Sequence, residues 1–317
     1  MATDPCAVSI VLSTRNNAAR LAVTLDRFRQ LEASRPGSWE IIAVDNGSTD
    51  GTARVLTAAA ERLPLRAVYW ATPGVSAARN AGIAKARGSL LVFTDDDVTV
   101  PPDWLSTYTS AFQAHGRQCY YGGPIDSQYE GPPVALDLLP YAPNSVKGLD
   151  WGETPHFLGE KEWFVAANWA CDAGVITEVG GFDSRFGLGQ SQGPMGGEEN
   201  LLMDALKSRG MRGLYLPAAR IGHWVPSKKT RPDHILERWE DSLVVRTWQQ
   251  SSSVGKTLLG VPRWHFRELL SAALGLLLAT LSGRRRIDDV VRFRRARAFV
   301  RGYRLKAAVI GPDKRAG

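Results

Sequence analysis

Three short, mostly apolar segments, each followed at once by polar residues, set the strongest limit on how this chain of 317 residues can fold. The segments are Val8–Leu12, Glu40–Val44 and Leu90–Phe93. Helical patterns lie between them, and the clearest is Leu21, Leu25 and Phe28, spaced as one helix face. Near-continuous apolar strands that alternate with helices are typical of a parallel sheet covered on both faces. We therefore expect an α/β fold, with a mostly parallel twisted sheet sandwiched by helices.

Local signals also indicate where two of these helices begin and end. Thr49 or Asp50 can cap a helix that runs to about Ala60. Ser76 can cap a second helix that runs to Ala86.

Polar clusters follow the three apolar segments. They are Thr14–Asn16, Asp45–Asn46 and Asp95–Asp97. In an open α/β sheet, ligands bind outside the carboxyl ends of the strands. The three adjacent carboxylates of Asp95–Asp97 repel one another unless a cation or hydrogen-bond donors balance them. Since Mg²⁺ and Mn²⁺ prefer oxygen ligands and keep phosphate oxygens as further ligands, this cluster predicts a Mn²⁺ or Mg²⁺ site. The alternative is an acidic turn that caps the next element.

The charge distribution divides the chain near residue 226. Residues 226–317 hold 20 Lys and Arg against 8 Asp and Glu, which gives +12, whereas residues 1–225 carry a net charge of −5. The tail also shows a helical spacing in Phe293, Ala296 and Val300. We expect one large α/β domain over residues 1–225, with halves 1–100 and 101–225, and a basic helical C-terminal appendage over residues 226–317.

The apolar run Leu269–Leu281 is shorter than the roughly 20 residues that a membrane-spanning helix needs. Arginines follow it, from Arg284 through Arg304. Two interpretations stay open. Residues 269–306 form a helical surface that makes peripheral contact with the inner face of a membrane, or Leu269–Leu281 packs on the catalytic domain as a core helix and leaves the arginines solvated. No nucleic acid is expected as a partner, because no strand carries interleaved aromatic and basic residues.

Cysteine usage indicates a reducing compartment. Cys6, Cys119 and Cys171 are an odd number without pairing or metal-ligand spacing. The first residues show no charged segment followed by an apolar run, so no signal peptide is expected. The sequence therefore predicts a cytoplasmic protein.

Five stretches, taken in order, resemble glycosyltransferase family 2, a large group of inverting enzymes with the GT-A fold. The stretches are Val8–Asn16, Val44–Thr52, Gly74–Asp97, Val179–Asp183 and Gly196–Leu201. The resemblance implies a GT-A catalytic domain over residues 1–225, whose first half binds the nucleotide sugar and whose second half binds the acceptor. It implies transfer of a sugar, most often from a UDP-sugar, to a saccharide or lipid-linked acceptor in bacterial glycan or glycoconjugate synthesis.

The resemblance also implies roles for matching residues on the donor side. The residues expected to bind the nucleotide diphosphate sugar are Thr14, Asn16, Asp45, Arg79, Asp95 and Asp96. Those expected at the Mn²⁺ or Mg²⁺ ion are Asp97, Asp95 and His223. The metal would neutralise the departing diphosphate.

Inversion also requires a base that takes the proton of the acceptor hydroxyl. In the family an acidic pair at the start of a helix supplies it, matched here by Glu198 and Glu199, of which the resemblance favours Glu199. The alternative is a pair of acids that favour the helix N-terminus. Asn168 and Trp163 are the residues expected to contact the acceptor.

Other functions on a similar sheet have signatures that this sequence lacks. A nucleotidyltransferase needs a Gly-rich loop with a phosphate-binding Lys or Arg after its first strand, and residues 13–17 show none. A processive membrane synthase carries a Gln-x-x-Arg-Trp motif, of which only Arg238 and Trp239 are present. Transfer of single sugars is therefore the favoured function, and a nucleotidyltransferase, or a protein that binds membranes or nucleic acid through its tail, is the alternative.

Overall fold

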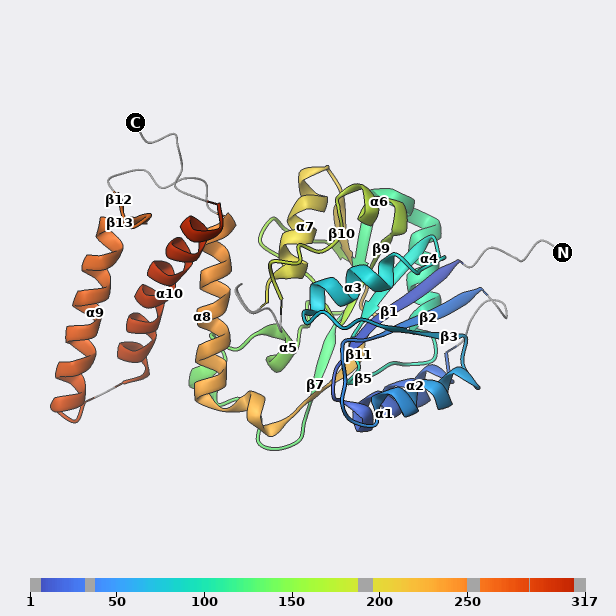
Figure 1. The fold of residues 1–317 in the computed structure, drawn as a ribbon, viewed down its shortest axis with the longest axis horizontal. Helices are drawn as coiled ribbons and strands as arrows, with labels where there is room; N and C mark the ends of the chain where they lie inside the picture. The colour runs from blue at the N-terminus through green and yellow to red at the C-terminus, as the bar shows by residue number, and fades with distance from the viewer. Residues whose placement is uncertain (1–6, 32–37, 188–195, 250–256, 285, 311–317) are drawn as a thin grey trace.

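The computed structural model describes residues 7–31, 38–187, 196–249, 257–284 and 286–310 (Figure 1). Its centre is an eight-stranded sheet in the order β3-β2-β1-β4-β9-β6-β10-β8. These strands are β1 (Val8–Thr14), β2 (Trp39–Asp45), β3 (Leu65–Tyr69), β4 (Leu90–Thr94), β6 (Cys119–Gly122), β8 (His156–Phe157), β9 (Asn168–Asp172) and β10 (Arg212–Tyr215). Neighbours pair in parallel from β3 to β4 and between β6 and β10. Strand β9 is antiparallel to both β4 and β6, and β8 is antiparallel to β10.

Helices cover both faces of this sheet. They are α1 (Ala18–Phe28), α2 (Thr52–Ala60), α3 (Val75–Ile83), α4 (Trp104–His115), α6 (Ala173–Glu178) and α7 (Glu198–Ser208), whereas the short α5 (Asn144–Lys147) lies outside this sheet. On one face, Ile10 and Leu12 of β1 pack with side chains of α1, α2 and α4. On the other face, Val11 packs with side chains of α6 and α7, and Val44 packs with α3. The alternation along β1 therefore produces two buried layers, and the predicted sandwich is confirmed.

A smaller sheet of three strands, β5 (Val98–Thr99), β11 (Ile221–Val225) and β7 (Ile125–Tyr129), lies at the carboxyl edge of the main sheet. Within it His223 stands opposite Val98 in the antiparallel pairing of β11 with β5. This register places His223 beside Asp95–Asp97, the acidic residues that follow β4.

The C-terminal region forms three long helices, α8 (Pro232–Gln249), α9 (Arg263–Leu281) and α10 (Ile287–Ile310), with a small hairpin of β12 (Thr257–Leu258) and β13 (Val261–Pro262) before α9. In Figure 1, α10 lies between α8 and α9, and α9 is farthest from the main sheet. None of the helices in the described ranges is long and apolar enough to cross a bilayer.

Some of the basic residues of the tail hold these helices together. The carboxylate of Glu240 on α8 pairs with Arg297 and Arg294 of α10, and Asp241 pairs with Arg301 at 3.1 Å. Because Glu240 and Asp241 are buried, these pairs belong to the helix interface. Part of the positive charge therefore has a structural role, contrary to the expectation of arginines that are only solvated.

Two helix boundaries differ from the predicted ones. Helix α2 begins at Thr52, after both expected caps, although Asp50 still accepts a hydrogen bond from the Thr52 amide at 3.0 Å. Helix α3 spans Val75–Ile83, so it ends three residues early, and the Ser76 hydroxyl donates to the carbonyl of Phe186 at 2.7 Å. The Ser76 hydroxyl, which the local sequence pattern assigned to a helix N-cap, therefore bonds to a distant segment of the chain.

Candidate active site

The three aspartates after β4 have three different surroundings. Asp96 turns back toward the end of β1, where it accepts hydrogen bonds from the Thr14 hydroxyl at 2.5 Å and the Asn17 amide at 2.8 Å. Burial raises the pKa of Asp96 to about 7, although the hydrogen bond from Thr14 opposes this shift. Asp96 therefore ties β1 to β4, whereas Asp95 and Asp97 face elsewhere.

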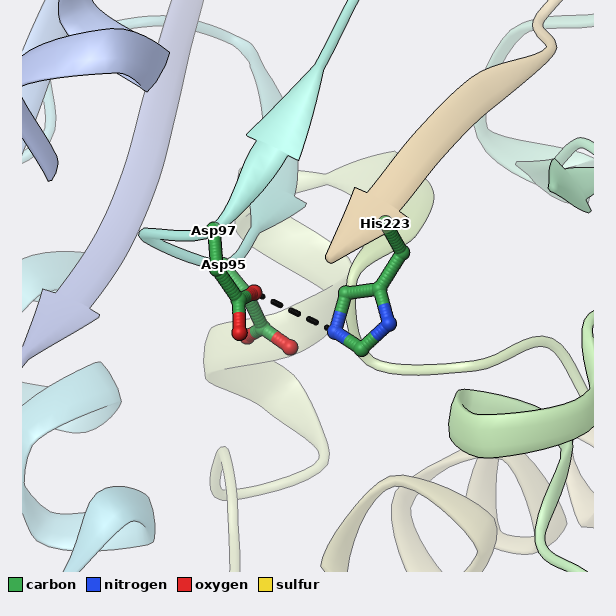
Figure 2. Close-up of side chains that lie close together, drawn as sticks. All are labelled: Asp95, Asp97 and His223. Atoms are coloured by element: carbon green, nitrogen blue, oxygen red, sulfur yellow. Dashed lines mark ion pairs between the residues drawn. The ribbon is translucent and has the colours of Figure 1, made fainter. Parts of the chain in front are cut away.

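Asp95, Asp97 and His223 form a compact cluster in which one ligand atom of each lies within 4.8 Å of the others. Figure 2 shows both carboxylates below the tip of a strand and the imidazole of His223 pointing toward them from β11. The Nε2 atom of His223 lies 3.1 Å from Oδ1 of Asp97. Oδ1 of Asp97 is buried, and this imidazole is its close polar neighbour. Two carboxylates and an imidazole whose ligand atoms lie this close together fit a divalent cation.

Positive groups around this cluster favour the ionised form of Asp97. Burial acts to raise the pKa of Asp97, but the neighbouring imidazole of His223 and the ammonium of Lys229 outweigh it and lower this pKa. The Lys229 Nζ atom lies 3.8 Å from Oδ2 of Asp97. Charge at the cluster is thus partly balanced by protein groups, as the repulsion between adjacent carboxylates requires.

Arg79 of α3 connects this cluster to the acids at the start of α7. Its buried guanidinium donates from Nη2 to Asp95 at 3.1 Å and from Nη1 to Glu198 at 2.8 Å. Glu198 lies 119 residues further along the chain. A buried arginine shared by two carboxylates fixes both of them, because breaking such a pair would leave an uncompensated buried charge.

Glu199, the second acid of α7, accepts no hydrogen bond from Arg79 within the described contacts. Its Oε2 atom is buried and without a hydrogen bond among the described contacts, although the residue as a whole is partly exposed. Burial and then the negative charge of Glu198 raise the pKa of Glu199 to about 8, with Arg79 opposing them. Arg79 thus bonds directly to Glu198, and Glu199 is the acid of the pair whose pKa is raised.

The other expected donor-binding residues lie at the neighbouring strand ends. The Asn16 side chain accepts a hydrogen bond from the Thr49 amide at 2.7 Å, and the Asp45 side chain accepts one from the Ser48 amide at 2.8 Å. Thr14 is bound to Asp96, as described above. These contacts order the loops after β1 and β2 next to the acidic cluster. Their roles toward a nucleotide remain predictions.

Asn168 has a different place from the expected one. Its side chain is completely buried and accepts from Trp104 Nε1 at 2.9 Å and Tyr108 Oη at 2.8 Å. It also donates to the carbonyls of Pro124 at 3.0 Å and Ala219 at 2.7 Å. All polar atoms of this amide are therefore engaged inside the protein, and the side chain has no group left for an acceptor sugar.

Replacing Asn168 with alanine should lower the free energy of unfolding by about 3 kcal/mol or more, because the buried groups that the amide satisfies would lose their partner. Urea unfolding monitored by tryptophan fluorescence measures this loss. Gln113→Ala, which removes an exposed amide on α4, is the matched control and should change stability by less than about 0.5 kcal/mol. Equal stability of the two variants would show that the buried amide is unimportant.

Trp163, the other residue expected at the acceptor, lies against the later part of α7. Its Nε1 donates to Asp204 at 2.6 Å, and Lys207 Nζ stands 4.7 Å from the ring centroid. Asp204 follows Glu199 by five residues, about 7.5 Å along the helix. One face of the ring is thus used by Lys207, and its contact with an acceptor remains a prediction.

Sequence reasoning missed two residues of the site, Asn17 and Lys229. Asn17 directly follows the polar cluster after β1, so its position in the sequence could have identified it as a residue of the site. Lys229 lies six residues after His223 in a short 3-10 turn, Ser227–Thr230, and no local pattern connects it to the aspartates. The turn that follows β11 brings its ammonium group to Asp97.

Residues 9–169, half of the chain, match the family model described as glycosyl transferase family 2. Validoxylamine A glucosyltransferase of Streptomyces hygroscopicus subsp. limoneus is 32% identical over 205 residues, which cover 56% of this chain and 44% of that protein. The succinoglycan biosynthesis protein ExoM of Rhizobium meliloti is 24% identical and covers 69% of this chain and 67% of its own length. The chain spans between 27% and 44% of the length of the first three curated relatives that it matches.

Solved structures share the fold. The mannosyltransferase PcManGT from Pyrobaculum calidifontis, in complex with GDP-Man and Mn²⁺, superposes with a TM-score of 0.57 at 18% identity, over 98% of this chain and 89% of that one. TarS of S. aureus in complex with UDP-GlcNAc gives a TM-score of 0.56 at 13% identity, over 96% and 84%. The GT-A architecture implied by the sequence resemblance is confirmed by these neighbours. With the family model matched across both β1 and the Asp95–Asp97 cluster, the chain belongs to glycosyl transferase family 2.

Proposed function

We propose that this chain is a metal-dependent inverting glycosyltransferase of the hexosyltransferase type. The donor is a nucleotide diphosphate sugar, for which we favour a UDP-sugar, and the acceptor is a hydroxyl of a saccharide or a lipid-linked glycan. Residues 1–225 would form the catalytic domain and residues 226–317 its appendage. The relatives support the chemistry, since their names include a glucosyltransferase, and two structural neighbours were solved with GDP-Man or UDP-GlcNAc.

The observation that carries the proposal is the arrangement of six ionisable groups at the carboxyl edge of the sheet. Asp95, Asp97 and His223 would hold the cation, and Arg79 links Asp95 to Glu198, which is followed by Glu199 in α7. Sugar transfer needs a cation beside the departing diphosphate and a carboxylate that takes the proton of the acceptor hydroxyl. The two groups must lie close together, because both act on the same sugar.

In the proposed reaction the acceptor oxygen attacks the anomeric carbon from the side opposite the diphosphate. Asp95, Asp97 and His223 would hold Mn²⁺ or Mg²⁺, which when bound supplies positive charge to the diphosphate oxygens. Glu199 takes the proton of the acceptor hydroxyl, and the electron pair of the broken C–O bond leaves with the diphosphate. Arg79 keeps Asp95 and Glu198 in place, so that Glu199 is the carboxylate free to change its protonation state.

A thermal-shift screen of UDP, GDP, ADP and CDP, each with and without Mn²⁺, tests this proposal. A ligand that binds only the folded protein stabilises it by RT ln(1 + [L]/Kd), about 2.7 kcal/mol at one hundred times Kd. We expect at least one nucleotide diphosphate to raise the Tm only when Mn²⁺ is present. If no nucleotide diphosphate shifts the Tm under any of these conditions, the proposed donor site is wrong.

The pH dependence of kcat/KM should report the raised pKa of Glu199. A base works as the carboxylate, and the pKa of Glu199 is raised to about 8, so activity is lost as the pH falls through that value. We expect kcat/KM to rise about tenfold per unit between pH 6 and 7.5 and to level off above about 8.5. Initial rates at constant ionic strength measure this profile, and a limb centred near the ordinary glutamate pKa of 4.5 would contradict it.

A further inference from the structure

Exposed apolar side chains gather at one end of the molecule. Among the described residues, thirteen large hydrophobic side chains are exposed, and eight of them lie between residues 257 and 281. These eight are Leu258, Leu259, Trp264, Leu270, Leu274, Leu277, Leu278 and Leu281. Since single exposed leucines are ordinary but a contiguous apolar patch marks an interaction site, this segment requires a partner. We call these eight side chains the leucine face.

Five leucines of the leucine face lie on the outer side of α9, at positions 270, 274, 277, 278 and 281. Leu270, Leu274 and Leu281 recur at spacings of four and seven, so they follow one line along the helix. The opposite side of α9 packs against α10, where His265 stacks on Phe299 with ring centroids 5.1 Å apart and Ala272 is buried. In Figure 1, α9 is the outermost helix, and its outer side faces away from the rest of the chain. The interpretation of Leu269–Leu281 as a core helix is therefore wrong for the outer side of α9, where the leucines are exposed.

The hairpin before α9 extends the same apolar surface. Leu258 is 50% exposed and Leu259 is 71% exposed, at the turn between β12 and β13. Leu259 also has a positive φ of 51°, which a branched apolar residue rarely adopts. Two leucines at an exposed turn, where polar residues or glycine are usual, indicate that the turn meets an apolar medium.

Unpaired positive charges border the leucine face at both ends. Arg263 and Arg267 lie on the exposed side of the first turns of α9, and Arg284 and Arg286 follow its last turn. None of these four side chains forms an ion pair within the described residues, in contrast to Arg297 and Arg301, which pair with α8. Apolar side chains flanked by free arginines are the pattern of a helix that lies in the interface of an anionic bilayer.

We propose that the leucine face, with Arg263, Arg267, Arg284 and Arg286, binds the surface of an anionic lipid bilayer, with α9 lying parallel to it. The line from Leu270 to Leu281 is about 17 Å long, which is too short to cross the roughly 30 Å hydrocarbon layer but suits a helix half immersed in its surface. Contact between two copies of this face is disfavoured. In a parallel or an antiparallel pair, basic ends of one helix would meet basic ends of the other.

Co-sedimentation of the full chain with vesicles tests this surface. One set of vesicles contains phosphatidylcholine with about 30% phosphatidylglycerol, and the other contains phosphatidylcholine alone. We expect binding to the anionic vesicles in low salt, a fall of at least tenfold in apparent affinity at about 0.5 M NaCl, and at least tenfold weaker binding to the neutral vesicles.

Two pairs of variants separate the apolar from the charged contribution. Leu274→Ser with Leu278→Ser should weaken binding to anionic vesicles at least tenfold, whereas Leu136→Ser, at an 84% exposed leucine elsewhere, should leave it unchanged. Arg263→Gln with Arg267→Gln should also weaken it, whereas Arg27→Gln with Arg62→Gln, at exposed arginines of the catalytic part, should not. The α-helical circular dichroism of every variant shows that the fold persists.

Three results would overturn the proposal. They are the absence of binding to both kinds of vesicle in low salt, equal binding by the Leu274→Ser and Leu278→Ser variant, and a leucine-dependent dimer in analytical ultracentrifugation in place of vesicle binding. This proposal is independent of the catalytic one, because vesicle binding requires no donor or metal. Nucleotide-induced thermal shifts measured on the same variants distinguish failure of the membrane surface from failure of the site.

Discussion

Replacing Glu199 with glutamine should lower kcat by about 10²- to 10⁴-fold and leave binding of the nucleotide diphosphate unchanged. Gln has the shape of the protonated acid but accepts no proton, so the variant retains the surroundings of Arg79 and loses only the base. Steady-state rates and calorimetric titration of UDP or GDP with Mn²⁺ measure the two quantities separately. A variant with unchanged kcat would exclude Glu199 as the base.

Glu198→Gln is the matched control for this variant, because the two acids are adjacent and both open α7. Glu198 already accepts a hydrogen bond from the buried Arg79 guanidinium at 2.8 Å, so we expect its carboxylate to fix Arg79 rather than to take the acceptor proton. We expect a smaller fall in kcat together with some loss of stability, since Arg79 would retain only part of its charge compensation. The opposite ranking of the two variants would assign the base to Glu198.

Asp97→Ala should abolish the metal dependence of nucleotide binding, with a loss in affinity of about 100-fold or more in the presence of Mn²⁺. The fold should persist, because Asp97 follows the end of β4 at the carboxyl edge of the sheet and is not part of the hydrophobic core. Calorimetric titration of UDP and GDP with and without Mn²⁺ measures the effect.

Asp103→Ala is the control for this second variant, as Asp103 is an exposed aspartate six residues later, before α4. It should bind nucleotide and Mn²⁺ like the natural protein. If Asp97→Ala keeps its full metal-dependent affinity, the cluster of Asp95, Asp97 and His223 is not the metal site.

The sheet could be predicted from the sequence because its strands are continuous apolar runs whose character does not depend on distant partners. Val8–Leu12 and Leu90–Phe93 both became central strands, paired in parallel as β1 and β4. Helix ends were less predictable. The hydroxyl of Ser76 fits an N-cap locally, but it bonds to Phe186, 110 residues away, and such a contact leaves no trace in a local pattern.

The site was predictable to the extent that strand ends determine it. Asp95 and Asp97 follow β4 directly, so their position at the carboxyl edge followed from the strand. The pairing of Arg79 with Glu198 did not, because it joins helices from opposite halves of the sequence. For Asn168 the sequence predicted a contact with the acceptor because the residue matches a family position. In the structure its amide instead makes four internal hydrogen bonds.

The basic tail shows why composition alone leaves two interpretations open. Its net charge counts Arg297 and Arg301 together with Arg263 and Arg284, although the first two are paired with buried acids of α8 and the last two are free within the described contacts. The packing of α10 between α8 and α9 determines which arginines are paired and which are not, and net charge does not contain this information.

The nucleotide product is the most direct test of the proposed activity. The chain is incubated with UDP-glucose, UDP-GlcNAc or GDP-mannose in the presence of Mn²⁺ and, separately, of EDTA, and the nucleotides are separated by ion-exchange chromatography. Transfer of a sugar breaks the bond between the anomeric carbon and the diphosphate, so we predict the nucleoside diphosphate from at least one donor, formed with Mn²⁺ and not with EDTA. Release of a nucleoside monophosphate, or of diphosphate at the same rate in EDTA, would contradict the account.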